Sequence, residues 1–515
     1  MRKRTHIFIL LFWIMAFSLY GCGKDDISEP SKPSEPDTPI NREHAFEIND
    51  KLGRGINLGN MYEDNYATDE AGNPWNPLKD EYFGIIANLG FKHIRMPIRW
   101  ETRSSETAPY KINDRFLSHI KSKVDKALAK NMSVIINMHH HEKLLTDPYG
   151  QKSRFLAQWG QIAEYFKNYS DKLVFEILNE PTGGITPAIW NNLLADGLKK
   201  IRESNPNRVV LIGTALGGHI DALKELKLPD DPNIILTVHY YLPFEFTHQG
   251  ADWTGMDMAQ WLGTKWYDTE IERKIVQQDF QVVDTYAKEQ NIPVHVGEFG
   301  AIDKADLDSR VRWTNYLTRW FEKKSYSWAY WEFSAGFGIY DRDKQALIQP
   351  LANALVKNSM PIPGNASLNT IYGSNFANNI NGWTLSKDKG VGTIQQTDGA
   401  LVVDIQNAGS NSWDLQIIKS GVSLQKGKHY LITMEVSSTT DRTSSVYIGL
   451  NAPNWDVYSG IRNFRNTTEK QKIYHLFMVK DAALNNGRLV IDLGGSATGK
   501  FNLYSCTLEE VTFQK

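Results

Sequence analysis

Short apolar runs alternate with longer amphipathic stretches along residues 52–355. Nearly continuous apolar runs separated by helical patterns are typical of parallel strands that are buried on both faces. The pattern predicts eight strands, at residues 54–58, 93–98, 133–139, 173–180, 208–214, 234–241, 293–300 and 328–333. It predicts helices at residues 79–89, 114–130, 153–168, 187–205 and 308–323.

Eight strand–helix units in about 300 residues fit a (β/α)8 TIM barrel. The predicted fold class of residues 43–358 is therefore α/β, a barrel. An open, doubly wound sheet is the alternative, and it usually carries a GxGxxG phosphate turn after its first strand. Here Gly53 and Gly55 are followed by Leu58 where that turn needs its third glycine, which favours the barrel.

The pattern changes after a linker at residues 359–365, which contains Pro361, Pro363 and Gly364. Beyond it, short alternating strands are separated by turn residues, at 401–405, 413–418, 430–436, 445–450, 472–478, 488–493 and 501–511. Such a series is typical of an all-β jelly roll or sandwich. Residues 366–515 are therefore predicted to form a second domain.

The N-terminus has the pattern of a secretion signal. A basic start precedes an apolar run at residues 7–20, which is short for a membrane span. The run ends in Leu-Tyr-Gly-Cys22, which resembles a bacterial lipobox, where the cysteine is acylated. We expect a signal peptide at 1–21, a lipid on Cys22 and, because prolines recur every third residue, a stiff tether over 22–42.

These features predict an outer-membrane lipoprotein with the membrane as a partner through its lipid. The acidic run after Cys22 resembles a surface-export signal, so the cell surface is the predicted location and the periplasmic face the alternative. A solvated charge run explains the same residues equally well.

Composition excludes several functional classes. The 57 basic and 59 acidic side chains give a net charge of −2, so nothing recommends nucleic acid as a partner. Two cysteines can build neither a disulfide framework nor a four-cysteine zinc site. Fifteen Trp, 22 Tyr and 22 Phe supply flat apolar faces that suit sugar rings as well as cores.

Polar side chains gather at the C-terminal ends of the predicted barrel strands, where barrel enzymes carry their catalytic groups. Among them, Glu180 ends the fourth strand and Glu298 the seventh, so the two should face each other across the barrel mouth. Glycoside cleavage needs such a pair. One acid protonates the leaving oxygen, while the other carboxylate attacks the anomeric carbon or activates water.

Several segments resemble glycoside hydrolase family 5 in sequence and order. They are Arg95 on strand two, LVFEILNEP at 173–181, HYY at 239–241, GEFG at 297–300 and Trp331. GRGINLGN at 53–60, PFEFTHQG at 243–250 and WAYWEF at 328–333 resemble endo-β-glucanases that also accept mannan. The resemblance covers nearly all of residues 50–355.

The resemblance implies that Glu180 is the general acid/base and Glu298 the nucleophile of a retaining enzyme, whose carboxyls lie about 5–5.5 Å apart. It implies supporting roles for Arg95, His139, Asn179, His239 and Tyr241, and substrate contacts at Asn60, Glu63, His140, His248, Trp253 and Trp331. Arg95 beside Glu298 is expected to lower the pKa of Glu298, and burial near that charge to raise the pKa of Glu180.

Three consecutive histidines, His139 to His141, precede Glu142 and suggest zinc as an alternative. The HExxH pattern fails, because Leu145 stands four residues after His141. We therefore predict no metal at this site and no cofactor for the reaction.

In the second domain, Trp383, NSWD at 411–414 and DLGG at 492–495 resemble carbohydrate-binding modules of families 4, 9 and 22. The resemblance implies a sugar platform at Trp413, Trp455 and Tyr458. Such modules often hold a structural calcium, but the sequence specifies no ligands for it. The alternative is a structural β-domain with aromatics in its core.

Together these observations predict a lipid-anchored, retaining endo-β-1,4-glucanase whose partner is β-glucan, with activity on (gluco)mannan. The alternatives are a β-mannanase, a xyloglucanase, a non-catalytic surface glycan-binding lipoprotein, and a metal-dependent hydrolase that uses the histidine run.

Overall fold

The structure is a computed structural model that describes residues 40–64, 72, 74–451, 454–480 and 482–514. The predicted signal peptide, the lipidated Cys22 and most of the tether lie outside the described residues. Each helix within them is too short or too polar to cross a bilayer.

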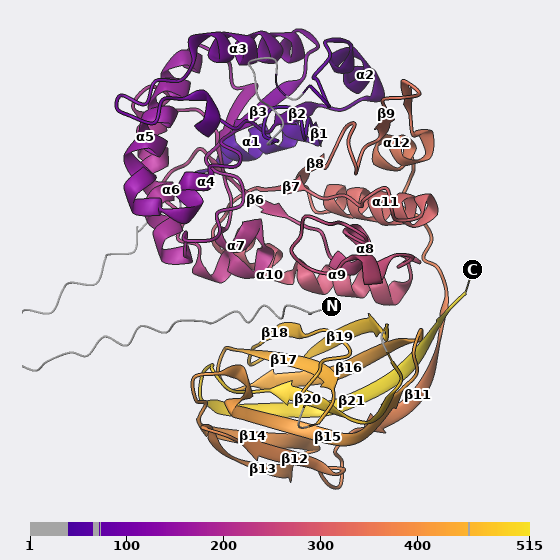
Figure 1. Cartoon of the computed structure of the whole chain (residues 1–515). Helices are drawn as coiled ribbons and strands as arrows, with labels where there is room; N and C mark the ends of the chain where they lie inside the picture. Colours follow the sequence, from indigo (N-terminus) through magenta and orange to yellow (C-terminus); the bar gives the residue numbers. More distant parts are fainter. Residues whose placement is uncertain (1–39, 65–71, 73, 452–453, 481, 515) are drawn as a thin grey trace, which may run out of the picture. The chain divides into compact units, whose positions relative to one another are not determined.

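Eight parallel strands close into a barrel in sequence order, with the first beside the last (Figure 1). In register, Asn57 lies beside Arg95, and His239 lies beside Glu298. All strands therefore end at one rim, which confirms the predicted TIM barrel. The strands are β1 (Arg54–Asn57), β2 (His93–Met96), β3 (Ser133–Asn137), β4 (Leu173–Glu176), β5 (Val210–Ile212), β6 (Ile234–His239), β7 (Val294–Glu298) and β8 (Ser327–Tyr330).

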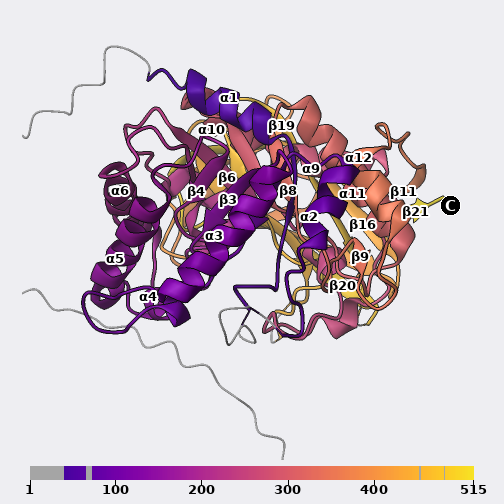
Figure 2. The same cartoon turned by 90° about the horizontal axis from the view of Figure 1, so that it is seen from above.

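Helices surround the barrel (Figure 1). The view from above shows α3 lying against the outside of β3 (Figure 2). No helix is predicted between strands six and seven, but the structure has α9 and α10 there. A small hairpin, β9 (Tyr340–Asp341) and β10 (Ala346–Leu347), follows β8. The helices are α1 (Glu43–Leu52), α2 (Glu81–Leu89), α3 (Asp114–Ala129), α4 (Glu142–Thr146), α5 (Pro148–Phe166), α6 (Pro187–Arg202), α7 (Ala215–Gly218), α8 (Phe244–Thr247), α9 (Glu270–Asp279), α10 (Gln281–Glu289), α11 (Leu307–Lys323) and α12 (Gln349–Val356).

Helix α1 closes the N-terminal end of the barrel. Its Ile48 and Leu52 are buried in one cluster with the strand residues Ile135, Val174 and Ile235. These apolar side chains fill the end of the barrel that α1 covers. The polar groups are thereby left to the opposite end, where the strands finish.

The C-terminal domain consists of two antiparallel sheets, with strand orders β13-β14-β21-β16-β19 and β12-β15-β20-β17-β18. Strand β11 pairs with β21. The all-β prediction is confirmed, but β11, β12, β13 and β18 lie outside the predicted strands, and Trp413 lies in a 3-10 turn (Ser412–Asp414) before its strand. The strands are β11 (Ala366–Ser374), β12 (Trp383–Lys387), β13 (Val391–Thr397), β14 (Ala400–Asn407), β15 (Leu415–Leu424), β16 (His429–Ser438), β17 (Arg442–Gly449), β18 (Arg462–Asn466), β19 (Gln471–Met478), β20 (Leu484–Asp492) and β21 (Gly499–Phe513).

Candidate active site

Two carboxylates meet at the rim of the barrel. Glu298 is the last residue of β7, and Glu180 follows β4 in a left-handed conformation with φ 44°. An oxygen of Glu180 lies within 4.8 Å of an oxygen of Glu298. Such closeness is typical of retaining glycosidases, because an inverting pair stands farther apart to admit a water molecule.

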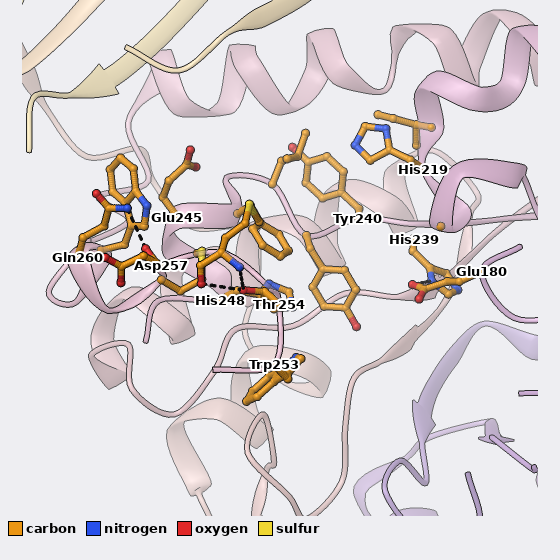
Figure 3. Close-up of a pocket in the computed structure, with 18 residues that line it drawn as sticks. Glu180, His219, His239, Tyr240, Glu245, His248, Trp253, Thr254, Asp257 and Gln260 are labelled. Atoms are coloured by element: carbon orange, nitrogen blue, oxygen red, sulfur yellow. Dashed lines mark hydrogen bonds and ion pairs between the residues drawn. The ribbon is translucent and has the colours of Figure 1, made fainter. Parts of the chain in front are cut away.

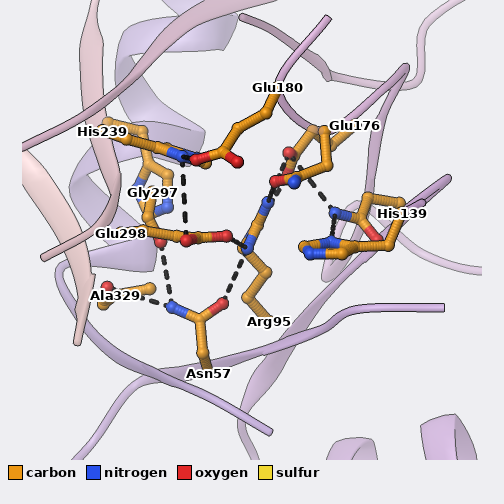
Figure 4. Close-up of polar contacts among 12 residues, drawn as sticks. Asn57, Arg95, His139, Glu176, Glu180, His239, Gly297, Glu298 and Ala329 are labelled. Carbon is orange, nitrogen blue, oxygen red and sulfur yellow. Dashed lines mark hydrogen bonds and ion pairs between the residues drawn. The ribbon is translucent and has the colours of Figure 1, made fainter. Parts of the chain in front are cut away.

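The buried Arg95 of β2 fixes the Glu298 carboxylate. Its Nη1 donates a 2.6 Å hydrogen bond to Glu298 Oε1, and its Nη2 donates at 2.9 Å to Asn179 Oδ1 (Figure 4). The guanidinium is 0 % exposed. Since Arg95 takes the oxygen of Asn179, the amide NH2 of Asn179 is the group left to donate to a substrate hydroxyl.

Two further residues complete this network: Asn57, a polar residue at the end of the first predicted strand to which no role was assigned, and Glu176, which was not predicted from the sequence. Asn57 accepts from Arg95 Nη1 at 2.8 Å and donates to the carbonyl of Gly297 at 2.9 Å. Glu176 accepts two 2.6 Å hydrogen bonds from Arg95. The available signal for Glu176 was an acidic residue inside an otherwise apolar strand, where an ionised side chain needs a partner.

His239 and Tyr241 contact the two carboxylates from β6 and the segment after it. His239 Nδ1 lies 2.7 Å from Glu180 Oε1 and 3.7 Å from Glu298 Oε2. The Tyr241 hydroxyl donates to Glu298 Oε2 at 3.0 Å. Each oxygen of Glu298 therefore has a charged or polar neighbour that orients it.

The pKa directions of this pair are the reverse of those expected from the sequence. Burial raises the pKa of Glu298, and the opposing charges of His239 and Arg95 do not overcome it. Burial would also raise the pKa of Glu180, but the hydrogen bond and charge of His239 outweigh burial and lower it. Burial is the largest influence on both carboxyls, and it is outweighed only at Glu180 because His239 Nδ1 lies 2.7 Å from Glu180 but 3.7 Å from Glu298.

His239 itself has a raised pKa. Burial acts against its charge, but the carboxylates of Glu298 and Glu180 more than compensate. The His239–Glu180 pair thus holds a proton beside the position where a leaving oxygen would stand.

Trp331 lies at the end of β8 and stacks against His139, with ring centroids 5.9 Å apart and planes 11° from parallel. His139 is buried and hydrogen-bonded to Asn137 at 3.0 Å. His140 packs edge-on against His139 at 4.5 Å between centroids and is partly exposed. This arrangement places an indole face, backed by an imidazole, at the barrel mouth.

The predicted substrate contact at Glu63 does not fit its position. The carboxylate is buried and accepts hydrogen bonds from the backbone N–H groups of Asn60, Met61 and Tyr62. Burial raises the pKa of Glu63 to about 8. Glu63 therefore holds the loop after β1 in shape, and with it Asn60, which stands at φ 60° at the half-buried edge of the site.

A cavity of about 680 Å³ opens beside Glu180 (Figure 3). His248 and Trp253, both predicted as substrate contacts, line it together with Phe244, His219 and Trp261. His248 stacks on Phe244 with centroids 4.0 Å apart, while Trp253 is 61 % exposed. Glu180 lines this cavity, whereas Glu298 and Trp331 do not.

The histidine run does not form a metal site within the described residues. His141 caps α4 by accepting from the N–H of Leu144 at 3.2 Å, whereas His139 faces Trp331. Among the described residues, one set of three side chains lies close enough together to ligate a metal: Glu180, His239 and Glu298. The guanidinium of Arg95, 2.6 Å from Glu298, opposes a second cation at that position.

In the C-terminal domain, Trp413 and Trp455 are 58 % and 54 % exposed, whereas Tyr458 is half-buried and packs against the sandwich core. Trp413 adjoins Ser412, which donates to Asp492, and Trp455 lies over Arg488 at 4.3 Å. Arg488 and Asp492 are four positions apart in β20, about 13 Å along a strand. Trp455 thus lies at one end of this stretch, while the residue that precedes Trp413 contacts its other end.

A polar cluster lies at the Asp492 end of this stretch. Gln416 donates to Asp492 at 2.7 Å and to the Tyr447 hydroxyl at 3.1 Å. The described residues of this domain gather no group of three His, Cys, Asp or Glu side chains. The predicted calcium therefore has no ligands assigned to it and stays a prediction.

Two family matches agree with this division. Residues 54–336 match the family described as cellulase (glycosyl hydrolase family 5). Residues 368–499 match a carbohydrate binding domain.

Individual relatives are similar over the barrel. Endoglucanase H of Acetivibrio thermocellus is 36% identical over 318 residues, which cover 60% of this chain and 33% of that protein, so the chain spans about a third of that relative. Endoglucanase Cel5A of Thermotoga maritima has a solved structure that is 45% identical, covers 61% of this chain and 99% of its own, and has a TM-score of 0.58. A second structure of Cel5A, 44% identical, is a complex with mannotriose as substrate; it covers 61% of this chain and 100% of its own, with a TM-score of 0.58. Since the family match spans more than half of the chain and contains both carboxylates, the protein belongs to glycosyl hydrolase family 5, the cellulase family.

Proposed function

We propose that the protein is an endo-acting hydrolase of β-1,4-glucan that retains the anomeric configuration. The observation that carries this proposal is the separation of Glu180 and Glu298, whose oxygens lie within 4.8 Å of each other. Arg95 and Tyr241 hold Glu298, while His239 holds Glu180. An aromatic cavity beside Glu180 suits a chain that continues past the cleaved bond.

In the first step, Glu298 attacks the anomeric carbon while Glu180 protonates the departing glycosidic oxygen. The bond between that carbon and that oxygen breaks as an ester to Glu298 forms. A sugar bound against Glu180 excludes water and raises its pKa, so the proton passes from His239 along their 2.7 Å hydrogen bond. Asn179 is placed to donate to the 2-hydroxyl, a contact that strengthens in the transition state.

In the second step, Glu180 takes a proton from water, which attacks the anomeric carbon and releases Glu298. Ester formation has removed the charge of Glu298, and loss of a nearby negative charge lowers the pKa of Glu180. The same residue thus serves as an acid first and as a base afterwards.

The test is hydrolysis of a panel of carboxymethylcellulose, mixed-linkage glucan, glucomannan, mannan and xyloglucan by the purified protein. We expect new reducing ends and a rapid fall in viscosity on the glucans, with β-anomers appearing first by NMR. Glu298→Gln should abolish turnover. Release from no polysaccharide would favour a glycan-binding protein, and loss of activity with a chelator would favour a metal-dependent hydrolase.

Mannan is the second candidate substrate. A protein that is 44% identical to the barrel has been solved with mannotriose as its substrate. Glucan and mannan differ at one hydroxyl, a difference worth about 1–3 kcal/mol at a contacting site. The ratio of kcat/KM on glucan to that on mannan decides between a glucanase, a mannanase and an enzyme of both kinds.

The C-terminal domain is proposed to bind polysaccharide through Trp413 and Trp455. Both indoles are exposed, and Gln416 and Asp492 form a polar pair close to Ser412, the neighbour of Trp413, which supports sugar stacking with hydrogen bonding beside it. A lipid on Cys22 and a tether at residues 22–42 would hold both domains at an outer membrane. Metabolic labelling with a palmitate analogue, compared between the wild type and Cys22→Ala, tests the anchor, and protease shaving of intact cells tests surface exposure.

A further inference from the structure

Glu176 is an acidic residue inside the barrel to which the reaction described above assigns no role. It ends β4, opposite Asn137 of β3, and its side chain is 1 % exposed. Both carboxylate oxygens bind Arg95, with 2.6 Å from Nε to Oε2 and 2.6 Å from Nη2 to Oε1. This bidentate geometry is the strongest that a guanidinium offers a carboxylate.

The remaining contacts of Arg95 all go to the reaction centre. Nη1 donates to Glu298 and to Asn57, and Nη2 also donates to Asn179. Because Glu176 fixes the plane of the guanidinium, it also fixes where these donors point. The position of the nucleophile therefore depends on a residue that does not contact it.

Glu176 also changes the charge balance of the barrel mouth. Three carboxylates, those of Glu176, Glu180 and Glu298, surround one permanent cation, Arg95 (Figure 4). Glu176 takes two of the five hydrogen bonds that Arg95 donates, whereas Glu298 takes one. The negative charge left over favours retention of a proton by the cluster.

We infer that Glu176 is a positioning residue for glycoside cleavage, which holds Arg95 in the plane that aligns Glu298 and keeps the catalytic proton on the Glu180–His239–Glu298 cluster to higher pH. The inference rests on the proposed retaining mechanism. The groups that face this cluster are Arg95 from β2, His139 and His140 after β3, Tyr241 after β6, and His248 from the segment beyond α8. Among them, Arg95 alone carries a permanent charge. How far Glu176 neutralises that charge therefore determines the electrostatic potential at the cluster.

Two variants separate charge from geometry. Glu176→Gln keeps the size and removes the charge, so kcat/KM on soluble glucan should fall at least about tenfold, and the alkaline limb of its pH profile should move down by about half to one unit. Glu176→Asp keeps the charge and loses the bidentate fit, so kcat should fall while the limb stays in place. The control is Glu272→Gln, another buried carboxylate, which accepts a hydrogen bond from the N–H of Thr269 at the start of α9 and shares no hydrogen bond with Arg95. This variant should lower Tm without moving the limb.

The inference is overturned if folded Glu176→Gln shows the wild-type limb, or if Glu176→Asp moves it as far as the glutamine variant. A purely structural role predicts equal limbs in both. Carboxyl-13C NMR titration of Glu180 and Glu298 in the same proteins provides a readout without turnover. If the wild type cleaves no glucan, the proposed function fails, yet a lower titration midpoint in Glu176→Gln than in Glu176→Asp would still support the charge argument, and equal midpoints would refute it.

Discussion

Tyr241 donates its hydroxyl to Glu298 Oε2 at 3.0 Å, on the oxygen that Arg95 does not bind. Burial and the nearby charges of Glu298 and Glu180 raise the pKa of Tyr241 well above its ordinary value. The phenol therefore stays protonated, and stays a donor, at every pH where the enzyme would work. A donor of this kind orients the nucleophile until the ester forms, so its loss should lower kcat.

We predict that Tyr241→Phe lowers kcat on soluble glucan by about tenfold to a hundredfold, because a hydrogen bond to a charged group contributes about 1.5–3 kcal/mol. KM should change little, since the hydroxyl acts on Glu298. Steady-state kinetics at the pH optimum measure both. A variant with unchanged kcat would show that Arg95 alone aligns the carboxylate.

Gly59 permits the close approach of Trp331 to the loop after β1. A Cβ atom on Gly59 would lie 2.9 Å from Cζ2 of the indole, which is closer than carbon atoms pack. Gly59→Ala should displace Trp331 from its stack on His139, raising KM severalfold and lowering kcat by about tenfold because the sugar is misplaced.

The matched control for that variant is Gly84→Ala. Gly84 lies within α2, and a Cβ there would meet nothing within 4 Å. Activity should be retained, and unfolding should cost about 0.5–1 kcal/mol more, because alanine loses less backbone entropy in a helix. Trp fluorescence of the two variants reports whether only Gly59→Ala moves the indole; equal kcat and KM in both would contradict a steric role for Gly59.

The sequence was sufficient for the catalytic pair and most of the residues that support it, but it was insufficient for Glu176. Glu180, Glu298 and His239 could be brought together because eight parallel strands that close in order must finish at one rim. Glu176 was not selected because it lies in the middle of the predicted strand at residues 173–180, whereas β4 in fact ends at Glu176. Its partner Arg95 is also 81 residues away in the chain. The contact between Glu176 and Arg95 depends on the register between the barrel strands, which the sequence does not show.

The C-terminal strands show the complementary limit. Five of the first six side chains of β14 are buried, so this strand could be predicted, whereas most side chains of β11 are exposed. An exposed strand at a sheet margin carries no hydrophobic period, since its pairing with β21 is made by the backbone. The pKa prediction for Glu298 failed because burial of this carboxyl outweighs the opposing charges of His239 and Arg95, and the depth of burial is not visible in the sequence.

The two exposed indoles of the C-terminal domain can be tested in the full chain. In a Glu298→Gln background, Trp413→Ala and Trp455→Ala should each weaken binding to insoluble polysaccharide by about tenfold, as expected for aromatic anchors at an interface. The control is Ile371→Ala, which removes an exposed apolar side chain from β11. Pull-down isotherms measure the change; equal binding by all three variants would place the sugar elsewhere.

Two histidines make the barrel sensitive to acid. His93 and His295 face each other in its interior with ring centroids 5.2 Å apart. Nδ1 of His93 is bonded to the carbonyl of Leu52 and Nδ1 of His295 to the Ser327 hydroxyl, each at 2.7 Å, while neither Nε2 has a hydrogen-bond partner among the described residues. Burial lowers the pKa of His93 to about 4 and that of His295 well below its ordinary value.

The unfolded chain takes up a proton at each histidine near pH 6.5, whereas the folded barrel keeps His93 neutral down to about pH 4. The unfolded state therefore binds more protons in this window, so stability is complete above pH 6.5 and is lost as the pH falls. For His93 the loss by pH 4 is about 3 kcal/mol. Urea unfolding at pH 7, 5.5 and 4.5 should show this decline, and His93→Gln should flatten it while lowering stability at pH 7. His44→Gln, at a surface histidine of α1, should leave the slope as in the wild type; a slope unchanged in His93→Gln would assign the acid sensitivity to other groups.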